Sequence, residues 1–291
     1  MINKKLHVIM AGMSRAGTSF MYHFFHKHPE LFLPSRKELG YFAHHHSHGF
    51  RWYEKFYEDA NKNQVTVDIC GIYFTDDKAI ERIKSECHQA KIILCVRRPT
   101  DWIYSFYEQY DGGFEMPSFS EFLDGCSIQR EGHEIKLDFR NEKISSTIMS
   151  YAESFGDNIL IYDFSLFKRD PLFVLNQIEN FIGISNYFNE ETFDNKKINA
   201  RGRKRSAIFE KTLQVKGVVA LILKLFPRNL VLALRRKWEE SAAKGEKGQT
   251  MVFSEDDMKK AQKVLENDEN FYNSLFSSEQ LFTGSKLIGK Q

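Results

Sequence analysis

The segment VIMAGMSRAGTS (residues 8–19) decides the fold. Its apolar first half is typical of a buried strand, and Gly12 and Gly17 bound a turn that leads into a helix. Backbone N–H groups at the start of such a helix bind phosphate. The glycine spacing matches a P-loop, but Thr18 follows the second glycine, where a P-loop NTPase has its phosphate-bridging lysine. Arg15 supplies a cation inside the loop instead. We therefore expect a nucleotide site that lacks one part for cleaving a β–γ phosphate bond, with an ordinary tight turn as the alternative.

Length and composition indicate one globular domain. A chain of 291 residues with 42% hydrophobic residues can bury a sizeable core, and a net charge of +2 gives no overall reason to expect nucleic acid as a partner. The charge is uneven, because residues 196–240 contain thirteen Lys or Arg against three Glu, an excess of ten. The four cysteines show no C-x-x-C spacing, and no cleavage site follows the short apolar run at the N-terminus. These features predict reduced thiols and a cytoplasmic protein.

Apolar runs alternate with helical patterns along the chain, which predicts an α/β fold: a P-loop-like parallel sheet flanked by helices, with a helical C-terminal extension. We expect a single domain over 1–291, with a core over 1–205 and the extension over 206–291. Residues 245–249 are the best linker candidate. The predicted strands are 6–11, 64–69, 91–96 and 158–162, and the predicted helices begin at 18, near 76, at 100 or 101, near 118, near 145, at 171 and at 255.

A second candidate for phosphate binding follows the third predicted strand. Arg97 stands at the carboxyl end of that strand, where open α/β sheets bind ligands, and Ser105 follows in the first turns of the next helix. The planar donor fork of arginine suits phosphate, and a serine hydroxyl adds a further hydrogen bond. The alternative is an Arg97 that pairs with a nearby carboxylate and a Ser105 that faces the sheet.

The connection after the first helix carries acid–base candidates. Lys37 and Glu38 lie between apolar flanks, so Glu38 is a candidate general base as well as a candidate surface charge. His44, His45, His46 and His48 follow closely. They lack the i, i+4 spacing of a helical zinc site, and we favour a polar loop near the substrate over a metal site. One of His44, His45 or His46 is the alternative to Glu38 as the base, because an imidazole is well matched to proton transfer at neutral pH.

Taken in order, these segments resemble the sulfotransferases that use 3′-phosphoadenosine 5′-phosphosulfate (PAPS), in particular the heparan sulfate and other carbohydrate O-sulfotransferases and their bacterial relatives. The resemblance covers about residues 6–205. It implies a 5′-phosphosulfate loop, a Lys-Glu-x-x-x-Phe segment with the catalytic base, a 3′-phosphate motif and a basic loop that closes over the nucleotide. The corresponding residues are Arg15, Ala16, Gly17, Thr18 and Ser19; Lys37, Glu38 and Phe42; Arg97 and Ser105; and Arg201, Gly202 and Arg203.

The resemblance implies metal-independent, in-line transfer of a sulfuryl group from PAPS to an acceptor hydroxyl, most naturally of a carbohydrate, with 3′-phosphoadenosine 5′-phosphate (PAP) as product. Arg15, Lys37 and Glu38 would be the catalytic residues. The chain departs from the heparan sulfate enzymes at residues 68–74, DICGIYF, where they carry a second catalytic lysine. Two alternatives remain: a P-loop kinase-like phosphotransferase with Asp163 as its metal-holding acid, and a non-catalytic protein that binds a nucleotide or a polysaccharide.

The basic segment, residues 215–236, can be interpreted in three ways. Residues 215–236 alternate apolar stretches with Lys and Arg, and Pro227 and four or more cations exclude a membrane-spanning helix. The segment is expected to contact an anionic polysaccharide or the surface of a membrane, or to pack on the domain as an ordinary helix. In the membrane case the protein would be cytoplasmic and peripherally attached.

Overall fold

The computed structural model describes residues 7–111, 116–130, 133–193 and 251–288. Its centre is a six-stranded sheet in the order β2-β3-β1-β4-β7-β8, and a separate antiparallel hairpin, β5-β6, stands beside it. Neighbouring strands of the sheet run parallel except for β8, which runs antiparallel to β7. The strands are β1 (His7–Gly12), β2 (Leu31–Phe32), β3 (Val65–Ile69), β4 (Lys91–Val96), β5 (Cys126–Arg130), β6 (His133–Leu137), β7 (Ile159–Asp163) and β8 (Leu281–Thr283).

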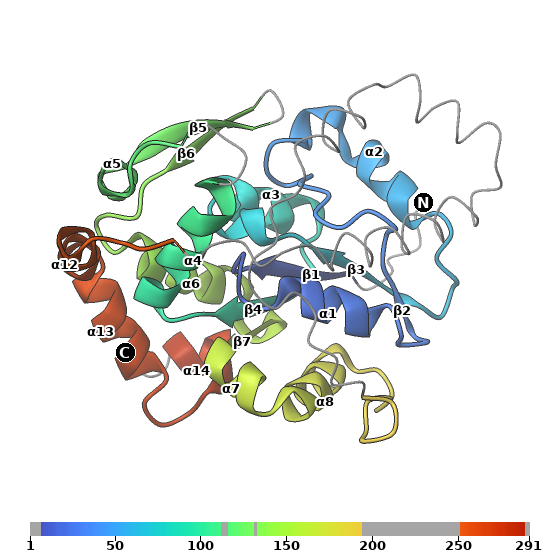
Figure 1. Cartoon of the computed structure of the whole chain (residues 1–291). Helices are drawn as coiled ribbons and strands as arrows, with labels where there is room; N and C mark the ends of the chain where they lie inside the picture. Colours follow the sequence, from blue (N-terminus) through green and yellow to red (C-terminus); the bar gives the residue numbers. More distant parts are fainter. Residues whose placement is uncertain (1–6, 112–115, 131–132, 194–250, 289–291) are drawn as a thin grey trace.

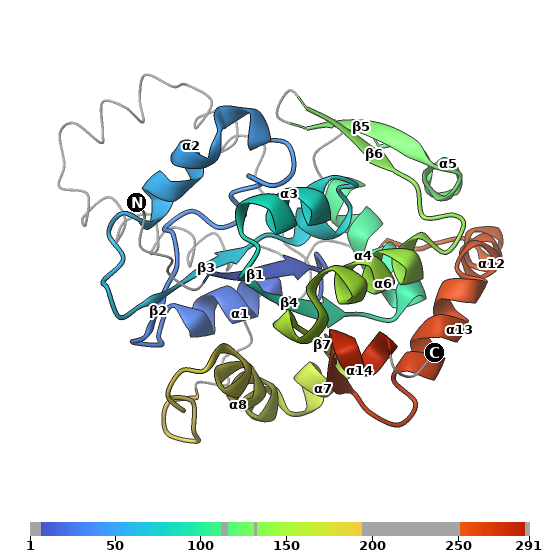
Figure 2. The same cartoon turned by 180° about the vertical axis from the view of Figure 1, so that it is seen from behind.

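Helices cover both faces of the sheet. Figures 1 and 2 show α8 below the sheet and α2, α3 and the β5-β6 hairpin above it, while α12 and α13 stand at one end. The α-helices are α1 (Thr18–Phe25), α2 (Phe50–Glu54), α3 (Ala79–Glu86), α4 (Pro99–Asp111), α5 (Phe119–Leu123), α6 (Lys143–Phe155), α7 (Phe164–Arg169), α8 (Pro171–Ile182), α12 (Glu255–Val264), α13 (Glu266–Leu275) and α14 (Gly284–Ile288). Short 3₁₀ turns are η1 (His46–His48), η2 (Lys55–Tyr57), η3 (Gly71–Phe74) and η4 (Gly156–Asn158).

The α/β fold with a mainly parallel sheet is confirmed. The four predicted strands correspond to β1, β3, β4 and β7, each within one residue of its expected bounds. Helix starts are confirmed where a cap marks them: the Asp170 carboxylate accepts from the N–H of Phe173 (3.0 Å), and Ser254 forms a reciprocal capping box with Asp257.

The C-terminal extension is mainly helical over its described residues, 251–288, and it also contains a strand that the sequence did not predict. Its strand β8 joins the edge of the main sheet, with Phe282 opposite Ile161 of β7. Three residues are too few to show strand periodicity, so the sequence carried little signal for this strand. The predicted boundary at residue 205 and the linker at 245–249 lie outside the described residues.

Helix α13 ties the C-terminal segment to two core helices. Helix α6 has no side-chain cap of its own, because Glu142 precedes it in a left-handed conformation (φ 58°). Asp268 of α13 supplies that cap by accepting from the N–H of Ser145 (2.7 Å), and Glu269 accepts from the N–H of Thr100 (2.7 Å) in the first turn of α4. Residues 266–275 are thus part of the packing that holds the sheet helices in place.

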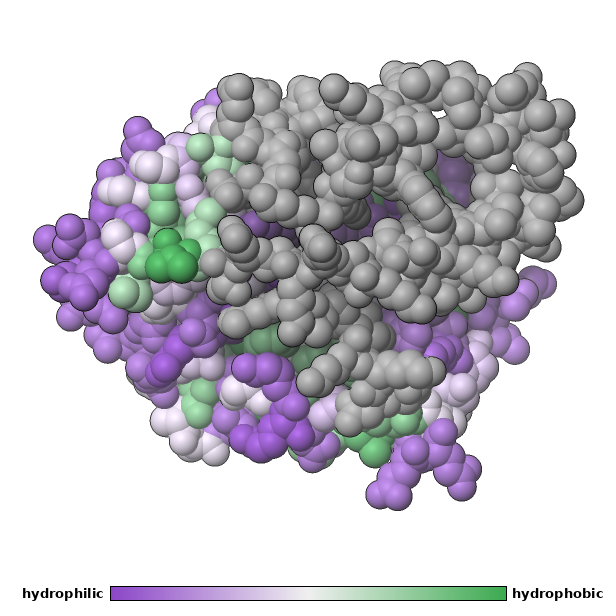
Figure 3. Space-filling view, viewed as in Figure 1, coloured by the Kyte–Doolittle hydropathy of each residue, from purple (hydrophilic) through white to green (hydrophobic). Residues whose placement is uncertain are grey.

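The surface agrees with a globular protein. The coloured part of the face in Figure 3 is mainly hydrophilic, with hydrophobic side chains in small, separate groups. Among the described residues, no helix is both long enough and apolar enough to cross a bilayer.

Candidate functional site

The phosphate loop lies between β1 and α1, at the carboxyl edge of the sheet. Gly17 caps α1 in a left-handed conformation (φ 84°), and a Cβ there would lie 2.7 Å from the ring of Phe167, so this position requires glycine. The loop is anchored to the neighbouring strand, because the N–H of Met13 donates to the carbonyl of Cys95 (2.9 Å). The first turn of α1 contains no acidic residue, which leaves its positive end available to an anion.

Arg15 connects this loop to the strand and helix that follow. Its Nε donates to the Ser105 hydroxyl on α4 (3.2 Å), and its carbonyl accepts from Nη1 of Arg97 (3.1 Å), directly after β4. Arg15 has a left-handed backbone (φ 65°), a conformation that costs free energy in a residue other than glycine and is found at ligand sites. Burial lowers the pKa of its guanidinium, while Glu108 and Glu38 act in the opposite direction. The structure therefore brings the loop, Arg97 and Ser105 together.

Lys37 places a second cation on the same loop. Its Nζ donates to the hydroxyls of Thr18 (3.0 Å) and Ser19 (2.9 Å) and lies 3.4 Å from the carboxylate of Glu38. Position 18 is a threonine and has no positive charge. In the folded protein Lys37, from the segment between β2 and β3, places a cation beside it.

Glu38 stands next to these cations on a bent segment. It has a left-handed backbone (φ 60°), and its N–H donates to the carbonyl of Ile69 at the end of β3 (3.2 Å). Its side chain is 37% exposed, so a ligand can reach it. Gly40 is also left-handed (φ 67°), and Nε2 of His44 lies 2.9 Å from the point where a Cβ would stand. The imidazole of His44 therefore fills the space above Gly40, two residues from Glu38.

The other histidines of this segment form a polar, aromatic loop. His46 pairs with Glu86 of α3 (3.0 Å), the rings of His44 and His45 meet edge-on (4.5 Å between centroids), and His48 stacks on Trp52 (4.9 Å). In the part of the chain that the structure describes, no three His, Cys, Asp or Glu side chains are grouped so that they could hold a metal ion. The zinc interpretation gains no support from this arrangement.

Asp163, the metal-holding candidate of the kinase alternative, has a structural role. Its Oδ1 accepts from the N–H of Ser165 (3.0 Å) and from the hydroxyl of Tyr272 (2.7 Å), and its Oδ2 accepts from the Ser165 hydroxyl. It caps α7 and fixes α13 to the end of β7. Both carboxylate oxygens are thus engaged by protein donors.

A buried polar network below Glu38 was missed by sequence reasoning. Asp68, 1% exposed on β3, accepts from the hydroxyls of Tyr73 (2.7 Å) and Tyr53 (3.1 Å), and Tyr53 also contacts the ring of His7. Burial raises the pKa of Asp68 to about 6, since two tyrosine hydroxyls offset only part of the desolvation. The next residue is the buried, apolar Ile69 in the segment 68–74, where the heparan sulfate enzymes are expected to carry a second catalytic lysine.

The remaining predicted site residues, Arg201, Gly202 and Arg203, and the basic segment 215–236 lie outside the described residues.

Known proteins resemble this chain in sequence. A family model described as "Sulfotransferase domain" matches residues 5–215. The chain is 26% identical over 211 residues to the mouse bifunctional heparan sulfate N-deacetylase/N-sulfotransferase 4, a match that covers 65% of this chain and 24% of that protein. It is 28% identical over 184 residues to the mouse heparan sulfate glucosamine 3-O-sulfotransferase 5, covering 60% of this chain and 53% of that protein. The chain thus spans about a quarter of the length of the first of these relatives.

The fold also matches a solved structure. The crystal structure of a sulfotransferase from Alicyclobacillus acidocaldarius superposes with a TM-score of 0.51 at 19% sequence identity, covering 66% of this chain and 87% of that one. At this identity the likeness concerns the fold alone.

Proposed function

This chain belongs to the sulfotransferase domain family, and we propose that it transfers the sulfuryl group of PAPS to a hydroxyl of a carbohydrate acceptor. One observation carries the proposal: Arg15, Lys37 and Arg97 converge on the phosphate loop, and the carboxylate of Glu38 stands beside them. Cations around a helix N-terminus suit a donor with several negative charges, and an adjacent carboxylate suits an acceptor that must lose a proton.

The residues present suit a donor that carries phosphate groups on the 5′ and 3′ positions of its ribose. Arg15, Lys37, Thr18, Ser19 and the N–H groups from Ala16 onward would hold the 5′-phosphosulfate. Arg97 and Ser105 would hold the 3′-phosphate. The hydrogen bond between Arg15 and Ser105 joins the residues for the 5′-phosphosulfate to those for the 3′-phosphate. The donor would therefore be bound by one connected set of side chains.

The chemistry requires a proton acceptor and stabilisation of the leaving group. When bound, PAPS supplies an activated sulfuryl group. Glu38 takes the proton of the acceptor hydroxyl while the bond between sulfur and the acceptor oxygen forms and the bond between sulfur and the bridging oxygen breaks. Arg15, Lys37 and the loop N–H groups stabilise the negative charge that develops on the 5′-phosphate of the leaving PAP. The migrating group carries one charge fewer than a phosphoryl group, and we propose that the two side-chain cations suffice without a metal ion.

A carbohydrate acceptor is supported by the two heparan sulfate enzymes that the chain resembles. The kinase alternative is weakened by Thr18 at the lysine position and by the engagement of both Asp163 oxygens. A protein that binds the donor without catalysis would share the phosphate site but would release no PAP.

A thermal-shift experiment with PAP, PAPS, ATP and ADP, with and without EDTA, separates these functions. The proposal predicts that PAP and PAPS raise the melting temperature far more than ATP or ADP and that EDTA changes nothing. Equal stabilisation by ATP, or stabilisation that requires Mg²⁺, favours the phosphotransferase. Stabilisation by PAPS without PAP release on a panel of glycans favours the non-catalytic binder.

A further inference from the structure

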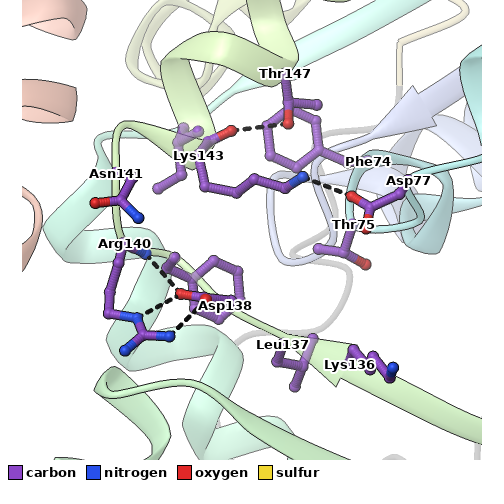
Figure 4. A pocket seen from close by; sticks show the side chains of 12 residues that line it. Phe74, Thr75, Asp77, Lys136, Leu137, Asp138, Arg140, Asn141, Lys143 and Thr147 are labelled. Carbon is purple, nitrogen blue, oxygen red and sulfur yellow. Dashed lines mark hydrogen bonds and ion pairs between the residues drawn. The ribbon is translucent and has the colours of Figure 1, made fainter.

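A cavity of about 310 Å³ lies beyond the carboxyl end of β3, outside the cluster described above. Figure 4 shows that its walls come from three segments: Phe74 and Thr75 at the end of η3, Leu137 and Asp138 at the end of β6, and Lys143 and Thr147 at the start of α6. The volume falls at the lower end of the range for sites that enclose small organic ligands.

Two ion pairs border the opening of this cavity. Nζ of Lys143 lies 2.5 Å from Asp77 on one side, and the guanidinium of Arg140 makes a two-pronged contact with Asp138 (2.8 and 2.7 Å) on the other (Figure 4). All four side chains are at least 41% exposed, so these pairs contribute little to folding stability but can exchange hydrogen bonds with a ligand.

The chemistry of the lining suits a sugar. Carboxylates and cations offer acceptors and donors for ring hydroxyls, and Asn141 and Thr75 add an amide and a hydroxyl. Phe74, Leu137 and Ile144 provide an apolar surface for the C–H face of a pyranose ring. The lining has three cations, Lys136, Arg140 and Lys143, and two carboxylates, Asp77 and Asp138, so it suits a sugar unit that offers hydroxyl groups and at most a small negative charge.

The loop that carries Asn141 is held in an unusual conformation. Asn141 (φ 57°) and Glu142 (φ 58°) are consecutive left-handed residues, and neither is glycine. Such strain persists where the surrounding structure fixes a side chain at a ligand site.

The wall of this cavity is continuous with the proposed donor and base sites. Gly71, at the start of η3, packs so closely on Ser14 of the phosphate loop that a Cβ would lie 2.4 Å from the serine oxygen. At the other end of η3, Phe74 lines the cavity and packs against Gly12. Farther along, Arg82 of α3 donates to the carbonyl of Phe42, in the segment that carries Glu38 (3.0 Å). Residues 71–86 therefore contact the donor loop, the base segment and the cavity.

We propose that this cavity is an acceptor subsite that binds a sugar unit of a carbohydrate chain other than the unit that is sulfated. The inference rests on the proposed sulfotransferase function. The subsite would fix the acceptor chain while another unit of the same chain reaches Glu38.

The test measures acceptor kinetics in two cavity variants, Arg140→Ala and Asn141→Gly. Asn141→Gly removes the amide and relieves the left-handed strain, so the fold should be retained. The control is Lys286→Met, which breaks an exposed ion pair of 2.7 Å with Glu279 on another part of the surface. Heparan sulfate, its chemically desulfated form, chondroitin and dextran serve as acceptors, and the variants are compared on the glycan that the unsubstituted protein sulfates fastest.

We expect each cavity variant to raise the KM for the glycan about two- to ten-fold, as expected for the loss of one or two hydrogen bonds, with kcat and PAP affinity unchanged. The control should behave as the unsubstituted protein. Unchanged KM in both cavity variants overturns the subsite and leaves the sulfotransferase function intact. Transfer to none of the four glycans, with PAPS still stabilising the fold, also overturns it. Failure of PAPS to stabilise the fold contradicts the proposed function itself.

Discussion

Three residues from different segments, Arg15, Lys37 and Arg97, provide the positive charge around the phosphate loop. Arg15 reaches Ser105 from within the loop, Lys37 reaches Thr18 and Ser19 from the following connection, and Arg97 holds the carbonyl of Arg15. Because each cation contacts a different part of the loop, we expect the loss of each cation to weaken the binding of a different part of the donor.

Arg97→Ala tests the 3′-phosphate assignment. A charge-assisted hydrogen bond of this kind contributes about 1.5–3 kcal/mol, so PAP binding measured by calorimetry should weaken roughly ten- to more than a hundred-fold. The matched control is Arg98→Ala, because Arg98 pairs with Glu269 (3.3 Å). Equal weakening of PAP binding in both variants would show that the nucleotide responds to the overall positive charge of the surface and not to a specific contact with Arg97.

Glu38→Gln tests the base. The substitution keeps the size and the hydrogen-bonding capacity of the side chain but removes the proton acceptor, so kcat should fall roughly 10²- to 10⁴-fold with little change in PAPS affinity. His44→Ala is the rival variant, because its imidazole stands over Gly40, and His46→Ala is the control, because His46 pairs with Glu86. Nearly normal turnover in Glu38→Gln together with collapse in His44→Ala would assign the base to the histidine.

At the scale of elements, strand β3 and the turn after it support the base segment through a buried network. Asp68 and His7 meet through the hydroxyl of Tyr53 and have opposite pH dependence. Burial lowers the pKa of His7 to about 3, so folding loses stability as pH falls below the ordinary value of 6.5. The pKa of Asp68 is raised to about 6, so its contribution is fully present below about 3.8 and is lost as pH rises through 6. Between pH 4 and 6 the two contributions oppose each other.

Asp68→Asn should therefore make the protein more sensitive to acid. The rise in the pKa of Asp68 from 3.8 to about 6 corresponds to about 3 kcal/mol of unfolding free energy. The unsubstituted protein gains this stabilisation as the pH falls from 6 to 4, and the variant does not gain it. Urea unfolding at several pH values should show a steeper loss of unfolding free energy in the variant over this range. The exposed Asp256→Asn serves as control. Parallel curves for Asp68→Asn and the unsubstituted protein would contradict the raised pKa.

The sequence predicted those elements whose signals are local. The strands β1, β3, β4 and β7 are runs composed mainly of β-branched or apolar residues. Arg97 could be placed because it directly follows β4, and Ser105 because it lies in the helix that comes next. The β5-β6 hairpin was missed although HEIKL (residues 133–137) alternates polar and apolar residues, a signal that could have found it. Strand β8 was too short to find. The contact of Lys37 with Thr18 and the network around Asp68 depend on how the chain returns to the sheet, which residue patterns do not specify.

At the scale of the whole molecule, the C-terminal residues 251–288 pack against the main sheet and its helices. Strand β8 extends the main sheet, and α13 caps α6 and α4 through adjacent acidic residues. The start of α4 and the start of α6, which lines the cavity, therefore depend on residues more than a hundred positions later in the chain.

Asp268→Ala tests this dependence. It leaves the buried N–H of Ser145 without its acceptor, which should lower the unfolding free energy by about 1–3 kcal/mol in urea titrations. Asp268→Asn retains an acceptor oxygen and should lose less. Equal stability of the alanine variant and the unsubstituted protein would mean that α13 is a peripheral attachment.

Transfer of sulfur from PAPS to a glycan can be measured by following the sulfur atom itself. The protein is incubated with ³⁵S-labelled PAPS and the glycan panel in the presence of EDTA, and label in the glycan and released PAP are both quantified. We expect label in a glycan, an equal amount of PAP, and loss of both in Glu38→Gln. No label in any glycan, with no more PAP than in the absence of the protein, would contradict sulfuryl transfer from PAPS to a carbohydrate.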